Sequence, residues 1–137
     1  RPNSDDGSDQ IRLVLDAYAQ DKDVRLLTHL ERASFVSWMA AADLMIGNSS
    51  AGIIEAATFG TPVVNVGTRQ NLRERNNNVI DVAPYPTELD NAIGQALARG
   101  RCETLNIYGD GRSADRIAKF LRTVSLDSDA LSKVNEY

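Results

Sequence analysis

The chain has 137 residues, of which 42% are hydrophobic and 25% charged, values typical of one globular domain with a core of its own. Its formal net charge of -4 argues against a general affinity for nucleic acid or for an anionic membrane surface. A single cysteine, Cys102, excludes an internal disulfide and a cysteine-rich metal site, and no apolar run approaches the ~20 residues of a membrane span, so we expect a cytoplasmic protein without a metal or other cofactor.

The first residues, from Arg1 to Ser8, have the composition of a loop that follows a strand, and we expect the chain to be a piece of a longer protein. Asn3 in this loop could orient sugar hydroxyls or could make an Asx turn. Apolar spacing then predicts a helix over residues 9–19 with Ser8 as its N-cap, a short strand over 24–28 and a second helix over 33–42.

The central feature is a turn in which the apolar run Leu44 to Ile46 meets Gly47, followed by Ser49 and Ser50 at the start of a helix predicted over 51–59. Such a turn can hold a phosphate, because the first backbone N–H groups of a helix lack partners and serine hydroxyls add donors. The same residue types are also ordinary helix caps, and this stretch alone leaves both interpretations open.

The remaining pattern predicts strands over 62–66 and 79–82, a polar loop over 67–78, and helices over 87–98 and 113–124, with Gly60 as a C-cap and Ser113 as an N-cap. Helices that alternate with short β-branched runs indicate an α/β fold, a Rossmann-like parallel sheet with helices on both faces. In such folds ligands bind outside the carboxyl ends of the strands, which selects the loops around Asn3, His29, Ser49 and Arg69.

Two of these loops carry further candidate residues. Arg69 could bind phosphate oxygens in bidentate fashion beside Ser49 and Ser50. The peptide groups of His29 and Leu30 could pair with the edge of a planar base, although a lone histidine is more often structural than functional. Glu55, about one and a half turns into the helix, could accept hydrogen bonds from ribose hydroxyls.

Several stretches, in the right order, resemble the UDP-N-acetylglucosamine 2-epimerase family, and in particular its hydrolysing branch, which makes precursors of sialic and legionaminic acids. They are the loop from Arg1 to Ser8, Gly47-Asn48-Ser49-Ser50, the run from Phe59 to Gln70, Asn78-Val79, and Ile107-Tyr108-Gly109-Asp110-Gly111. The resemblance implies that residues 1–137 are part of the C-terminal, nucleotide-binding domain of a GT-B-type enzyme, whose N-terminal domain would be its partner and which forms a homo-oligomer.

The resemblance also implies residue roles. Ser49 and Ser50 would hold the diphosphate of a UDP-sugar, Glu55 the ribose, and Arg69 would lie at the nucleotide. His29 and Leu30 would meet uracil, and Asn3 would face the UDP-sugar. The implied reaction is elimination of UDP to a 2-acetamidoglucal, followed by addition of water. The family's catalytic carboxylates lie in the N-terminal domain, so we expect no catalytic residue here and no turnover by the chain alone.

Three other interpretations remain open: a non-hydrolysing 2-epimerase, a GT-B glycosyltransferase, and a non-catalytic module that binds a nucleotide sugar. Non-hydrolysing members more often have a Gly-Gly pair where Ser49-Ser50 stands, which favours the hydrolysing branch. The sequence leaves open whether the sugar is N-acetylglucosamine or a 2,4-diacetamido analogue.

Overall fold

A computed structural model describes residues 8–103 and 105–125 of the chain. The chain divides into two compact units, Arg1–Ala42 and Asp43–Tyr137. The loop that contains Asn3 lies outside the described residues, as does the stretch beyond Ser125.

The first unit contains two helices, α1 (Ser8–Ala17) and α2 (Arg32–Ala41), close to the predicted ranges. Ser8 is the first residue of α1 rather than its cap. The predicted strand over residues 24–28 is wrong, because the structure has irregular chain there. A strand persists only where its N–H and C=O groups pair with a neighbouring strand, and the described elements of this unit are helices, which offer no such partner.

The second unit is built on a parallel sheet, as predicted, and its strand order is β1-β2-β3. The strands are β1 (Met45–Gly47), β2 (Val63–Val66) and β3 (Val79–Val82). Residue Val63 pairs with Met45 on one side and with Val79 on the other, so β2 is flanked by both neighbours. Three of the four residues of β2 are fully buried, which explains its nearly continuous run of valines.

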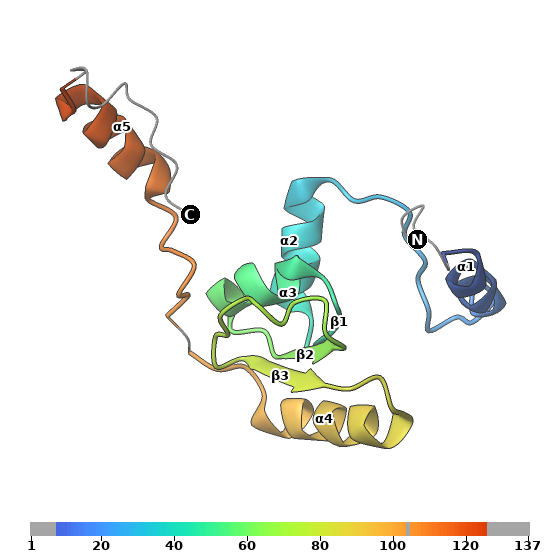
Figure 1. Cartoon of the computed structure of the whole chain (residues 1–137). Helices are drawn as coiled ribbons and strands as arrows, with labels where there is room; N and C mark the ends of the chain where they lie inside the picture. The colour runs from blue at the N-terminus through green and yellow to red at the C-terminus, as the bar shows by residue number, and fades with distance from the viewer. Residues whose placement is uncertain (1–7, 104, 126–137) are drawn as a thin grey trace. The chain divides into compact units, whose positions relative to one another are not determined.

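Helices cover both faces of this sheet, with α3 (Ser50–Ile54) on one face and α4 (Pro86–Arg99) on the other (Figure 1). On the α4 face the core forms around Val64, Ala92 and Ala96. On the opposite face Gly52 of α3 packs directly against the Val63 side chain. The last helix, α5 (Ser113–Thr123), begins after Arg112, so Ser113 is its first residue and not its cap.

The single helix predicted over residues 51–59 is instead two short helices, α3 and a 3-10 helix, η1 (Ala56–Phe59), which meet at Glu55. The break has a chemical cause. The side-chain amides of Asn76 and Asn106 donate to the carbonyls of Ile53 and Ile54, at 3.3 and 2.8 Å, where a continuous helix would place its own N–H groups. Gly60 ends η1 in the left-handed conformation, with φ 65°, which confirms the predicted C-cap.

Candidate functional site

The turn after β1 and the loop after β2 lie at one edge of the sheet. Because β1 and β2 are parallel neighbours, their carboxyl ends at Gly47 and Val66 point the same way. The residues that follow them are Asn48 to Ser50 on one strand and Gly67 to Asn78 on the other. This juxtaposition brings together two of the loops that the sequence selects for ligand binding.

Ser49 is the N-cap of α3, with its Oγ accepting a hydrogen bond from the Ala51 backbone N–H at 3.3 Å. This confirms the capping interpretation, and it leaves the hydroxyl proton of Ser49 available to a second acceptor, since a hydroxyl both accepts and donates. Ser50 is half-buried in the first turn. Since α3 has only five residues, the two hydroxyls would have to contribute more than the helix dipole to any anion site.

A direct hydrogen bond joins the two loops. The side-chain Nε2 of Gln70 donates to the Asn48 carbonyl at 2.9 Å. Gln70 is buried, with 6% of its surface exposed, although it lies in a loop in which several neighbours are exposed. The bond joins the residue after Arg69 to the residue before Ser49, and so it ties together the backbone segments that carry the candidate phosphate ligands.

The side chain of Arg69 is exposed. Beside its loop, the carboxyl ends of β2 and β3 enclose an open depression of about 270 Å³. Its lining residues are Gly67, Thr68, Asn71, Asp81, Val82, Ala83 and Pro84. Ser49, Ser50 and Arg69 do not line this depression, so it adjoins the candidate phosphate-binding residues without containing them.

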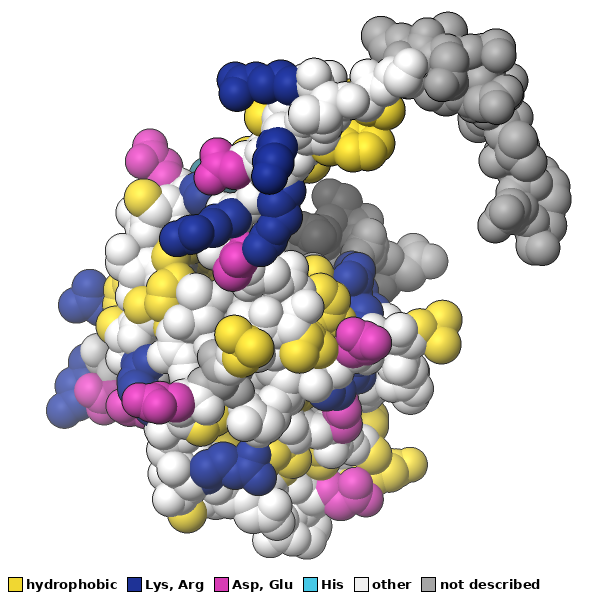
Figure 2. Space-filling model, turned by 90° about the vertical axis from the view of Figure 1, so that its left-hand side faces the viewer, with side chains coloured by type: hydrophobic (Ala, Val, Ile, Leu, Met, Phe, Trp, Pro, Cys, Tyr) yellow, Lys and Arg dark blue, Asp and Glu magenta, His cyan; other side chains and the backbone are white. Residues whose placement is uncertain are grey.

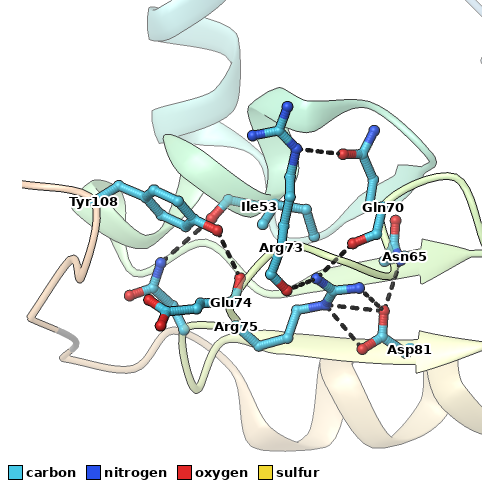
Figure 3. A network of polar contacts seen from close by, with 9 residues as sticks. Ile53, Asn65, Gln70, Arg73, Glu74, Arg75, Asp81 and Tyr108 are labelled. Carbon is cyan, nitrogen blue, oxygen red and sulfur yellow. Dashed lines mark hydrogen bonds and ion pairs between the residues drawn. The ribbon is translucent and has the colours of Figure 1, made fainter. Parts of the chain in front are cut away.

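The loop after β2 is also fastened to β3 by a network around Asp81 (Figure 3). The Nε of Arg75 donates to both Asp81 carboxylate oxygens, at 3.1 and 2.9 Å, and its Nη1 donates to the Gln70 carbonyl at 2.9 Å. The same guanidinium also donates to the Arg73 carbonyl. Across the sheet, the Asn65 amide donates to Asp81 Oδ1 at 2.6 Å.

These contacts set the charge of Asp81. Partial burial opposes ionisation, but the hydrogen bonds from Arg75 and Asn65, with the positive charge of Arg75, outweigh it and hold the pKa of Asp81 below its ordinary value. Asp81 is therefore a carboxylate with a structural partner, and a poor proton acceptor near neutral pH.

The other candidate residues are placed as follows. Glu55 is half-buried at the junction of α3 and η1. His29 is exposed and Leu30 half-buried, both in the irregular part of the first unit. Asn3 lies outside the described residues. The proposed contacts of these residues with ribose, uracil and sugar stay predictions.

Sequence reasoning missed Gln70, Asn65 and Asp81. For two of them a signal was present. Each of the strands Val63–Val66 and Val79–Val82 has one polar residue at its third position, and these residues, Asn65 and Asp81, are direct partners in the register. A polar residue at the same position of two adjacent, otherwise apolar strands indicates a cross-strand hydrogen bond.

Basic and acidic side chains are both spread over the face drawn in Figure 2. Among residues 8–103 and 105–125, no three histidine, cysteine, aspartate or glutamate side chains gather as a metal site would require. In the same part of the chain, no helix has the length and apolar character needed to cross a bilayer.

Comparison with known proteins gives the chain its relatives. The sequence model of the family described as UDP-N-acetylglucosamine 2-epimerase matches residues 1–122. The chain is 46% identical, over 99% of its length, to the UDP-N,N'-diacetylbacillosamine 2-epimerase (hydrolyzing) of Legionella pneumophila, of which it covers 36%. It is 31% identical, over 90% of its length, to the UDP-N-acetylglucosamine 2-epimerase of Neisseria meningitidis, of which it covers 33%. Over 59% of its length it is 39% identical to the GDP/UDP-N,N'-diacetylbacillosamine 2-epimerase (hydrolyzing) of Campylobacter jejuni, covering 22% of that protein. The chain thus spans about a third of the length of the first two relatives.

Proposed function

Because the chain belongs to the UDP-N-acetylglucosamine 2-epimerase family, we propose that it forms the UDP-binding part of a hydrolysing 2-epimerase. The observation that carries the proposal is the joining of two loops at one sheet edge. One contains Ser49 and Ser50, the other Arg69, and the bond from Gln70 to Asn48 fastens them to each other. Two hydroxyl donors and a guanidinium complement the oxygens of a diphosphate.

In the proposed reaction these residues act on the leaving group. A base removes the proton from C2 of the sugar, the bond from C1 to the UDP oxygen breaks, and a C1–C2 double bond forms. UDP leaves as an anion whose charge Ser49, Ser50 and Arg69 stabilise. Water then adds across the double bond, with its hydroxyl on C1 and its proton on C2, and gives the free 2-acetamido sugar with inverted C2.

The substrate that we propose is a UDP-linked 2-acetamido sugar. The Legionella and Campylobacter relatives are both named for N,N'-diacetylbacillosamine, a 2,4-diacetamido sugar, and both are named as hydrolysing. UDP-N,N'-diacetylbacillosamine is therefore the first substrate to test, with UDP-N-acetylglucosamine, named for the Neisseria relative, as the second. A mannosamine-type product would feed the synthesis of sialic or legionaminic acids.

The diphosphate site is tested by titrating UDP into the chain by calorimetry, with Ser50→Ala and Arg69→Ala alongside. We expect each substitution to weaken UDP binding, by about tenfold for Arg69→Ala, because charge-assisted hydrogen bonds contribute about 1.5–3 kcal/mol each. Arg122→Ala is the matched control, because Arg122 is an exposed arginine in the last turn of α5, outside the two loops that carry the candidate ligands. Affinities unchanged in both site variants would remove Ser50 and Arg69 from the site.

A further inference from the structure

Gln70 differs in burial from the residues beside it in the loop. It is nearly fully buried within a loop whose flanking residues, Arg69 and Asn71, are exposed. Both ends of its side-chain amide are used: Nε2 donates to the Asn48 carbonyl at 2.9 Å, and Oε1 accepts from Arg73 Nε at 2.8 Å. The amide has one orientation that satisfies both contacts, because only its nitrogen can donate and only its oxygen can accept.

The hydrogen bond from Gln70 to Asn48 joins the two segments that carry the candidate ligands. Asn48 precedes Ser49 directly, and Arg69 precedes Gln70 directly, so Ser49 and Arg69 each lie one residue, or about 3.8 Å along the chain, from the contact. Because this hydrogen bond holds the two segments at a fixed separation, it limits how far the serine hydroxyls and the guanidinium can lie from each other when they bind one anion.

Gln70 is in turn connected to the sheet through its backbone. The backbone carbonyl of Gln70 accepts from Arg75 Nη1 at 2.9 Å, and Arg75 is paired with Asp81 of β3 (Figure 3). Gln70 thus links the turn after β1, through Arg75, to β3, and does so across the carboxyl end of β2. No part of this chain of contacts uses the side chains of Ser49, Ser50 or Arg69, which stay available to a ligand.

We propose that Gln70 is a positioning residue for diphosphate recognition, which acts through Asn48 and the loop backbone to hold Ser49, Ser50 and Arg69 at the spacing that a nucleoside diphosphate requires. This inference rests on the proposed function, because it names how that same site is held. It predicts that loss of the Gln70 donor weakens recognition of the diphosphate and leaves recognition of the nucleoside unchanged.

The test is a titration of the isotopically labelled chain with UDP and, separately, with uridine, followed by nuclear magnetic resonance, which measures weak affinities. Gln70→Met keeps the length of the side chain and removes the donor. We expect about tenfold weaker UDP binding and unchanged uridine binding. Gln70→Glu is the second variant, because it keeps an acceptor for Arg73 but places a carboxylate against the Asn48 carbonyl, and it should lose UDP affinity at least as strongly. Gln95→Met, at an exposed glutamine of α4, is the matched control and should bind both ligands like the wild type.

Each outcome decides one point. A fall in UDP affinity alone supports the positioning role. Equal losses for UDP and uridine overturn it, because they indicate a general structural role, and so does wild-type UDP affinity in both variants. If the wild-type chain itself binds no UDP, the proposed function fails, and the inference about Gln70 fails with it.

Discussion

At the scale of single residues, Asp81 decides how the loop after β2 is held. Its carboxylate accepts from Arg75 of the loop and from Asn65 of the neighbouring strand, so one side chain joins two strands and a loop. Asp81 is about half exposed and Arg75 is 22% exposed. Such a pair contributes little to global stability, on the order of 1 kcal/mol or less, because solvent screens it. Its main effect is therefore local, on the position of the loop that contains Gln70.

The lowered pKa of Asp81 predicts an acid-sensitive contribution to stability. The folded state binds the Asp81 proton less tightly than the unfolded state, so the contribution is present above the ordinary aspartate pKa of about 3.9 and is lost as the pH falls through the lower, folded value. We expect Asp81→Asn to lower the free energy of unfolding by about 1 kcal/mol or less at neutral pH, and the difference from wild type to vanish in acid. Urea unfolding at several pH values measures this.

The control for this experiment is Asp90→Asn, at an exposed aspartate of α4. Its stability difference from wild type should vary less with pH than that of Asp81→Asn. A difference for Asp81→Asn that stays constant from neutral pH into acid would contradict the role that we give to the pair with Arg75.

At the scale of elements, the segment from Ser50 to Gly60 is shaped by side chains that are distant in the sequence. Asn106 donates to the Ile54 carbonyl and to Thr58 Oγ1, both at 2.8 Å, while Asn76 donates to the Ile53 carbonyl. Tyr108, in the Tyr-Gly-Asp-Gly stretch, donates from its hydroxyl to the Glu74 carbonyl at 2.9 Å. The stretch near residues 106–108 therefore fixes both the break in the helix and the loop after β2.

These contacts explain how far the sequence could predict the fold and the site. Periodicity placed β3 at its observed bounds and located α2 and α4 within a residue, because those patterns are local. The break at Glu55 could not be predicted, since it depends on amides that lie 23 and 52 positions from their acceptors. Ser49 and Arg69 were chosen from local motifs, whereas the bond that joins their loops spans 22 positions and has no local pattern.

Gly60 provides a test of how η1 ends. Its φ is 65°, and a Cβ at this position would lie 2.4 Å from the Cys102 carbonyl oxygen, a backbone atom that a rotamer change cannot move. Gly60→Ala should therefore destabilise the chain by more than the 1–2 kcal/mol, roughly, of a left-handed alanine alone. Gly94→Ala in α4 is the matched control, because a Cβ there meets nothing within 4 Å, and it should stabilise the chain by about 1 kcal/mol. Thermal unfolding of the two variants measures both effects, and equal melting temperatures would contradict this account of Gly60.

At the scale of the whole molecule, apolar burial is uneven. The sheet and α4 bury their apolar side chains, and Val64 and Ala96 are at most 1% exposed. In contrast, α1 and α5 bury none of their residues, and Leu13 and Phe120 are 73% and 62% exposed. Helices with one apolar side usually cover another part of a protein. The candidate phosphate-binding residues Ser49, Ser50 and Arg69 follow strands of the well-packed sheet, whereas the helices with exposed apolar sides lie elsewhere in the sequence.

The 137-residue chain should not catalyse the proposed elimination by itself. Elimination needs a base at C2 of the sugar as well as stabilisation of the departing diphosphate. We assign this chain only the second role: Asp81 is paired with Arg75 and is a weak base, and Glu55 is proposed to bind the ribose. We therefore expect the 137-residue chain to bind UDP weakly and to release none from UDP-N-acetylglucosamine or UDP-N,N'-diacetylbacillosamine. An enzyme-coupled assay for free UDP measures this, with the full-length Legionella relative as the positive control. Release of UDP by the chain, abolished by Arg69→Ala, would show that the missing base lies within these residues.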